Sequence, residues 1–204
     1  MAHAFSRLMF TPRVKAEQAR LGSRGAYARF EAPEFEARDR LGPQEIAFIA
    51  ARDSFYMATV TETGWPYVQH RGGPAGFLTP LDDRTLAFAD FRGNRQYVSL
   101  GALKGDDRVS LILMDYPNQA RLKLLGRVRV VEAEEDPALM AALQAPGYRA
   151  HVERAFVIAL EAFDWNCPQH ITPRFTLEQV EALTAPLRAR VAELEARLPG
   201  GPEA

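Results

Sequence analysis

A chain of 204 residues, 47% of them hydrophobic, is long enough for one domain of ordinary size with a substantial core. Its 25 basic and 26 acidic side chains nearly cancel, which argues against a general nucleic-acid binder. The single cysteine excludes an internal disulfide framework, and the sequence shows neither a signal peptide nor an apolar run of about 18 residues, so we expect a soluble, cytoplasmic protein without a membrane span.

Residues 1–42 are expected to form an N-terminal helical extension. Within it, residues 14–30 are rich in Ala, Arg, Glu and Gln with only scattered apolar positions, which indicates an exposed helix at the periphery. The next helix is predicted over residues 41–51, because Ile46 and Ile49 recur at helical spacing and would face the core.

Residues 43–165 are expected to form the main domain, because short β-branched and aromatic runs follow one another with turns between them. The predicted strands cover residues 54–61, 67–71, 85–90, 108–115, 120–131 and 155–163, and a further short run lies at residues 77–79. Gly126 interrupts an alternating run and predicts a bulge or bend, which a small barrel needs at its corners. These features indicate a mainly β, α+β protein built on a small antiparallel barrel of six or seven strands.

Residues 166–204 are expected to form a linker and a C-terminal amphipathic helix. Thr176 and Gln179 have the spacing of a capping box, and the helix should continue to about residue 198. Its a and d positions over about three heptads are Leu177, Val180, Thr184, Leu187, Val191, Leu194 and Leu198. This apolar stripe either packs on the barrel of its own chain or pairs with a second subunit.

The segment Phe88–Tyr97 carries the strongest signal for a ligand, because a strand ends there in a turn that opens a short helix. Gly93 lets a ligand approach the backbone closely, and the following Asn94, Arg95 and Gln96 supply hydrogen-bond donors. Donors beside a helix N-terminus favour a phosphate. The alternative is a turn whose polar side chains are simply solvated.

Other chemistry is sparsely represented. No two of the four histidines have the tight spacing of a helical zinc site, so no metal is expected. His70 lies on a strand, where a lone histidine is more often structural than catalytic, and Cys167 near His170 is more often inert than nucleophilic. The sequence has no Gly-x-Ser-x-Gly elbow, Walker loop or Gly-x-Gly-x-x-Gly fingerprint. The common nucleophile and nucleotide-binding classes are therefore disfavoured.

Several motifs in fixed order suggest a family. A Gly-Trp-Pro-Tyr turn between two strands is followed by Phe-Ala-Asp-Phe-Arg-Gly-Asn-Arg-Gln, a helix, Asp-Arg-Val-Ser-Leu and Leu-Leu-Gly-Arg-Val-Arg-Val. Over about residues 45 to 165 this order resembles the pyridoxamine 5'-phosphate oxidase-like family of flavin split barrels. The resemblance implies a six-stranded antiparallel split β-barrel with peripheral helices, and a homodimer that binds FMN in a groove at the subunit interface.

The resemblance also implies which residues bind the cofactor. They are Gln69, His70, Arg71, Gly72, Ala89, Asp90, Asn94, Arg95, Gln96, Arg121, Trp165 and Arg174. By position, Arg95 corresponds to the arginine that contacts the FMN phosphate, and Gln96 replaces a lysine of the oxidases. The strand before them would run along the flavin, and Ala89 and Asp90 would lie next to its ring. Trp165 corresponds to a residue that approaches the flavin from the partner subunit.

The expected function is electron transfer through FMN, from a nicotinamide or small-molecule donor to an acceptor. The chain lacks the Arg-Leu-His-Asp-Arg motif with which the oxidases proper hold their substrate, so vitamin B6 oxidation is not implied. It is more similar to a bacterial subgroup of FMN-binding proteins related to the oxidase. The alternative is a carrier or sensor that binds FMN, heme or F420 without turnover. No residue is singled out as catalytic, since the flavin would carry the chemistry.

Overall fold

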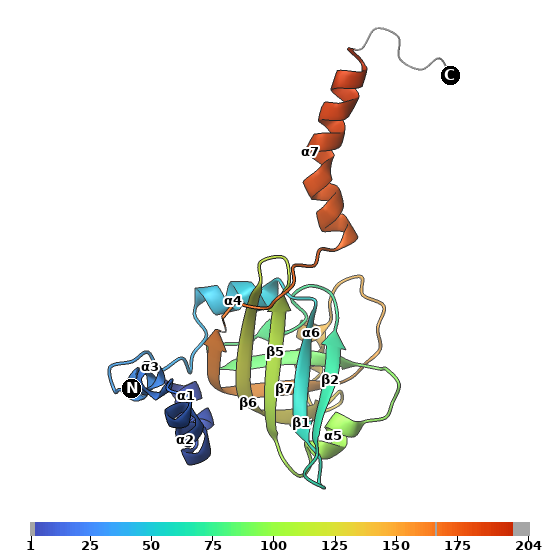
Figure 1. The fold of residues 1–204 in the computed structure, drawn as a ribbon. Helices are drawn as coiled ribbons and strands as arrows, with labels where there is room; N and C mark the ends of the chain where they lie inside the picture. Colours follow the sequence, from blue (N-terminus) through green and yellow to red (C-terminus); the bar gives the residue numbers. More distant parts are fainter. Residues whose placement is uncertain (1–2, 166, 198–204) are drawn as a thin grey trace.

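The computed structural model describes residues 3–165 and 167–197 (Figure 1), so Leu198, expected in the apolar stripe of the last helix, lies outside the described residues. One antiparallel sheet has the strand order β2-β1-β5-β6-β7-β4-β3. The strands are β1 Ser54–Val60, β2 Pro66–Gly72, β3 Thr79–Pro80, β4 Thr85–Phe91, β5 Arg108–Asp115, β6 Ala120–Glu132 and β7 Val152–Trp165. The mainly β, α+β class expected from the sequence is confirmed.

The sheet has seven strands in place of the six that the family resemblance implied. The additional strand, β3, is only two residues long and pairs with the start of β4. It contains Pro80, which has no backbone N–H to give to a ladder and is tolerated only at a sheet edge. The strand therefore stays short and at the edge.

The sheet bends back over itself to form the barrel. In Figure 1, the antiparallel strands β1, β2, β5 and β6 lie upright and β7 crosses behind them at a steep angle. The pairing register of β6 with β7 shifts between Leu125 and Gly126, which confirms the bulge predicted at this glycine. A Cβ atom on Gly126 would lie 2.6 Å from the Ala159 carbonyl oxygen and 2.7 Å from a methyl group of Ile158. Only glycine fits this close approach.

Aromatic side chains from β1, β4 and β7 pack together in the core. Phe88 of β4 pairs with Phe156 of β7, and their rings stack with centroids 5.1 Å apart. The ring of Phe55 meets Phe88 edge-on at 5.2 Å, and all three side chains are almost fully buried. Such rings bury large apolar areas, so they fix the end of β4 rigidly.

The helices lie outside the barrel. They are α1 Ala4–Met9, α2 Pro12–Arg20, α3 Arg24–Ala28, α4 Pro43–Ala50, α5 Val98–Ala102, α6 Pro137–Leu143 and α7 Leu177–Glu195, with a 3-10 turn at Arg29–Glu31. Figure 1 shows α1 to α3 beside the barrel, and α4 over one end. Within residues 3–165 and 167–197, no helix is both long and apolar enough to cross a membrane.

Helix α4 differs from the prediction in which face it buries. Ile49 is fully buried as expected, but Ile46 is 39% exposed while Glu45 is only 7% exposed. The Glu45 carboxylate accepts the indole N–H of Trp165 at 2.7 Å and the backbone N–H of Gly42 at 3.0 Å. These two hydrogen bonds make the burial of a carboxylate tolerable.

Helix α7 begins with the predicted capping box: Thr176 Oγ1 accepts the backbone N–H of Gln179 at 3.2 Å, and the Gln179 side chain accepts that of Thr176 at 2.9 Å. The helix projects away from the barrel (Figure 1), and none of its residues is buried. Packing on the barrel of its own chain, one of the two alternatives for its apolar stripe, is not observed among the described residues.

Candidate functional site

An open cleft of about 240 Å³ lies where β4 ends and the turn before α5 begins. Strands β2, β4 and β7 and helix α5 supply its walls. The lining residues are Gln69, Arg71, Asp90, Phe91, Gly93, Asn94, Arg95, Tyr97, Ser99, Leu100 and Glu153. The segment that the sequence singled out therefore forms one side of a real cleft.

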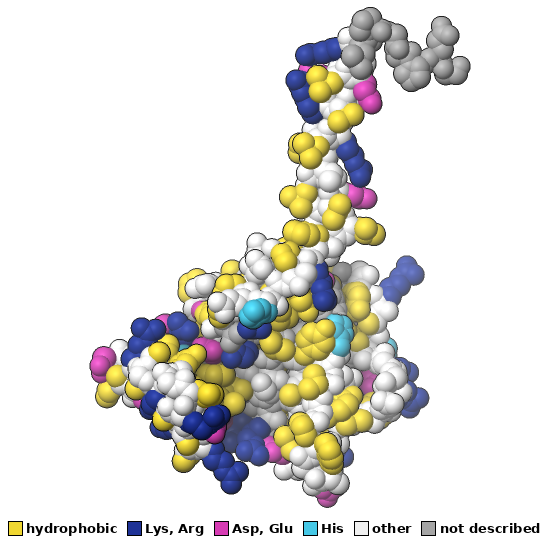
Figure 2. Space-filling view, viewed as in Figure 1, with side chains coloured by type: hydrophobic (Ala, Val, Ile, Leu, Met, Phe, Trp, Pro, Cys, Tyr) yellow, Lys and Arg dark blue, Asp and Glu magenta, His cyan; other side chains and the backbone are white. Residues whose placement is uncertain are grey.

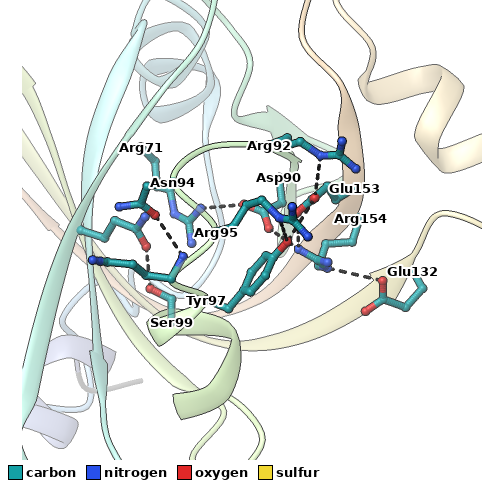
Figure 3. Close-up of polar contacts among 12 residues, drawn as sticks. Arg71, Asp90, Arg92, Asn94, Arg95, Tyr97, Ser99, Glu132, Glu153 and Arg154 are labelled. Atoms are coloured by element: carbon teal, nitrogen blue, oxygen red, sulfur yellow. Dashed lines mark hydrogen bonds and ion pairs between the residues drawn. The ribbon is translucent and has the colours of Figure 1, made fainter.

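A buried carboxylate between two arginines forms the floor. Asp90 Oδ1 accepts from Arg71 Nη1 at 2.6 Å, and Asp90 Oδ2 accepts from Arg154 Nη1 at 2.8 Å (Figure 3). The three side chains are between 9% and 13% exposed. Burial works against the charged form of Arg154, but the hydrogen bonds to Asp90 and Glu132 and the charges of these two carboxylates together outweigh burial and raise the arginine pKa. The cluster is a fixed ionic support with few free donors.

The turn on the other side of the cleft is held in an uncommon backbone conformation. Arg95 and Tyr97 have φ values of 61° and 52°, in the left-handed region that side chains with a Cβ rarely adopt. Tyr97 Oη accepts from Arg95 Nε at 3.2 Å and donates to Glu153 Oε1 at 3.2 Å. The hydrogen bond to Tyr97 raises the Arg95 pKa. The ring of Tyr97 thus links the turn to β7.

The Glu153 carboxylate, on the cleft wall, accepts hydrogen bonds from several side chains. Burial disfavours its charge, but hydrogen bonds from Arg92 and Tyr97 and the charge of Arg154 outweigh burial and hold the pKa below its ordinary value. Arg92 Nε lies 3.0 Å from Glu153 Oε1, which leaves Arg92 paired. The carboxylate is therefore ionised and fully engaged at neutral pH.

Arg95 is the cation that stays available to an anion. Arg71, Arg92 and Arg154 each form an ion pair at the site, whereas Arg95, in the described part of the chain, forms none. Its side chain is exposed beside the cleft, and a guanidinium fork suits a phosphate. A second unused donor is the buried Nε of Arg71, which has no hydrogen-bond partner among the described residues.

Two amide side chains complete the wall. Gln69 Oε1 accepts from the buried Ser99 hydroxyl at 2.9 Å, which ties β2 to α5. Asn94 Oδ1 accepts the backbone N–H of Gln96 at 3.2 Å and so shapes the turn. Among the residues predicted from the sequence, the cleft brings together Gln69, Arg71, Asp90, Asn94 and Arg95, with Gln96 in the same turn.

Three other predicted residues point elsewhere. Side chains alternate along a strand, so His70 lies on the opposite face of β2 from Arg71, exposed and edge-on to Tyr56 at 5.5 Å. Gly72 ends that strand and does not line the cleft. Ala89 is buried on the far face of β4, in the core cluster that α6 covers. In the single chain, these three positions do not contribute to the cleft.

The remaining predicted residues lie away from the cleft of their own chain. Trp165, at the end of β7, donates its indole N–H to Glu45. Arg121 lies on β6, where its Nε is buried without a hydrogen-bond partner among the described residues. The guanidinium of Arg174 stacks over the ring of Tyr116 at 5.0 Å. Any role at an FMN site would require a second copy of the chain.

Sequence reasoning missed four residues that build the site: Tyr97, Ser99, Glu153 and Arg154. The first two lie in or just after the turn, and the short spacing could have indicated them. The other two come from β7, and only the antiparallel register that pairs Asp90 with Arg154 brings them near the turn. No local signal in the sequence marks that pairing.

Comparison with known proteins identifies the domain. The family model described as pyridoxamine 5'-phosphate oxidase matches residues 42–165, more than half of the chain. No curated protein matches the sequence.

Three solved structures are similar to this chain in fold. HupZ of Group A Streptococcus is 16% identical over 66% of this chain and 100% of its own, with a TM-score of 0.49. A Clostridium acetobutylicum protein related to general stress protein 26 is 15% identical over 67% and 94%, with a TM-score of 0.47. An FMN-binding protein of Syntrophomonas wolfei is 14% identical over 76% and 95%, also at 0.47. At this level of likeness none of them carries its own activity over to this chain.

Proposed function

The chain belongs to the pyridoxamine 5'-phosphate oxidase family, and from that premise we propose that it is an FMN-binding oxidoreductase with its phosphate site at Arg95. The observation that carries the proposal is the position of Arg95, an exposed guanidinium beside the cleft without a carboxylate partner among the described residues. A phosphate supplies the missing charge-assisted partner. The turn is already held by Tyr97 and Asn94, so little ordering is needed on binding.

The residues fit the phosphate end of the cofactor better than the whole of it. The cleft of about 240 Å³ is smaller than the roughly 300–1,000 Å³ of pockets that enclose molecules of this size. Its polar lining suits a phosphate and a ribityl chain, while the flavin ring requires a further wall. This supports a site that a second copy of the chain completes.

The outer face of β1 and β2 is the surface through which we expect that second copy to bind. Figure 2 shows hydrophobic side chains gathered over these strands, and Trp65 and Val68 are 74% and 60% exposed. Tyr56 and His70 lie on the same face. An apolar patch of this kind, rimmed by polar groups, favours a protein interface. In such a homodimer, Arg121 and Trp165 of one copy would approach the cleft of the other.

Bound FMN would supply the transfer of electrons, and the chain's own residues hold and orient it. Asp90, Tyr97 and Glu153, the titratable groups of the cleft other than arginine, are each engaged by a neighbouring side chain. Their engagement favours positioning over proton transfer. It equally supports the second candidate, a carrier or sensor that binds flavin without turnover.

The absorbance spectrum of the purified protein tests the proposal. We expect a yellow protein with an absorbance band at about 450 nm that NADH or NADPH bleaches in the absence of oxygen. Bound flavin that neither donor reduces would favour the carrier. Protein that is colourless and does not quench the fluorescence of added FMN would contradict flavin binding itself.

A further inference from the structure

The apolar seam of α7 is open to solvent along its whole described length. Leu177 is 83% exposed, Leu187 67% and Val191 53%, although these residues repeat at the a and d positions of heptads. Figure 2 shows the hydrophobic side chains running up the helix. A monomer rarely leaves such a seam uncovered, because large contiguous apolar patches mark interaction sites.

The charged side chains of α7 indicate which partner would cover its apolar seam. The first half carries Glu178 and Glu181 without a basic residue, and basic side chains begin at Arg188. Farther along, Glu193 is already paired within the helix, with Arg190 and Arg197, each at 2.5 Å. Glu178, Glu181 and Arg188 have no ion-pair partner in the residues that the structure describes. The second half, with Arg188 and Arg190 beside Glu193 and Glu195, is neutral overall. Helices that run in opposite directions bring the acidic first half of one beside the arginines of the other, whereas parallel helices place the two acidic halves together.

We propose that α7 pairs antiparallel with α7 of a second copy of this chain. In this register Leu177 packs against Leu194 of the second copy and Val180 against its Val191, so every exposed a and d side chain is covered. The e position Glu181 then lies near Arg188 of the second copy, twice across the twofold axis. A parallel pair leaves both residues unmatched and aligns the helix dipoles unfavourably.

The position of Pro186 agrees with this pairing. Proline removes one backbone hydrogen bond inside α7, and in the heptad defined by Leu187 at d it occupies the outer c position. Its ring therefore lies outside the seam. The pairing does not depend on FMN, because it uses only residues of α7, which lies outside the matched family domain.

Cysteine pairs on α7 test both the partner and its direction. Starting from Cys167→Ser, the double variant V180C/V191C should form a disulfide-linked dimer under mild oxidation, whereas V180C alone should stay uncrosslinked. Positions 180 and 191 are about 16 Å apart along one helix, so a disulfide between them joins two chains. The matched control A182C/A189C places two cysteines on the outer f positions and should remain monomeric on a non-reducing gel.

Two outcomes would overturn the proposal. If V180C/V191C gives no more dimer than A182C/A189C, the seam does not pair with another α7. If V180C alone gives as much dimer as the double variant, the helices run parallel. Positions 180, 182, 189 and 191 are exposed on α7, and Cys167 is exposed in the segment before it, so equal urea midpoints for all variants will show that folding is intact.

Discussion

Replacing Asp90 by asparagine is expected to lower the free energy of unfolding by about 3–5 kcal/mol, the usual cost of removing one partner from a buried ion pair. Asp90 is 7% exposed and holds Arg71 and Arg154 at 2.6 and 2.8 Å. Arg154 keeps contacts with Glu132 and Glu153, but Arg71 loses its ion-pair partner. The loss should appear as a lower urea midpoint with an unchanged m-value.

A matched control separates burial from charge. Asp83→Asn removes the same charge from an exposed pair with Arg40, 2.7 Å apart, and should leave the midpoint nearly unchanged. The double variant R71M/D90N, which also removes the orphaned guanidinium, should recover part of the lost stability. A midpoint for D90N equal to that of the wild type would refute the structural role of the cluster.

The outcome of this experiment bears on the site, because it decides which arginines can bind a ligand. If Asp90 holds Arg71 and Arg154 in place, their Nη1 groups are committed to the protein. The phosphate must then rely on Arg95, with the free Nε of Arg71 as a second donor at most. The next residue, Gln96, carries no charge, so it adds no second cation beside Arg95 and this reliance becomes stronger.

The sequence predicted those parts of the fold that depend on neighbouring residues. The capping box at Thr176, the bulge at Gly126 and the helix predicted over residues 41–51, observed as Pro43–Ala50, all follow from local backbone preferences. The buried face of α4 was wrong at Ile46 because Glu45 finds a partner in Trp165, 120 residues away. Distant pairing of this kind leaves no periodic signal.

In the candidate site, too, the residues close together in sequence were predictable, and those brought in by strand pairing were not. The turn around Arg95 was predictable, since glycine, asparagine and arginine follow a strand end directly. Glu153 enters the site only through the pairing of β4 with β7, which a single sequence does not reveal. His70 could have been separated from Arg71 in advance, because consecutive strand residues face opposite sides. The family resemblance placed both along the flavin, and the dimer proposed above would reconcile the two.

Replacing Arg95 by alanine is expected to weaken FMN binding by about 1.5–3 kcal/mol, roughly ten- to 150-fold in Kd, the cost of one charge-assisted phosphate contact. The side chain is exposed and its only hydrogen bond among the described residues is to Tyr97, so the fold should persist. Quenching of FMN fluorescence during titration with protein gives the Kd of each variant. Higher salt should narrow the difference between the variant and the wild type, since the contact is ionic.

Two comparisons identify the contact as one to the phosphate. Arg92→Ala removes an equal charge from the same turn, but Arg92 is already paired with Glu153 at 3.0 Å, so its effect on FMN should be small. Riboflavin has no phosphate, and its affinity should be the same for the wild type and R95A. If R95A weakens riboflavin as much as FMN, Arg95 shapes the turn instead of binding phosphate. If R92A and R95A lose FMN affinity equally, only the summed charge of the turn matters, and the assignment to Arg95 fails.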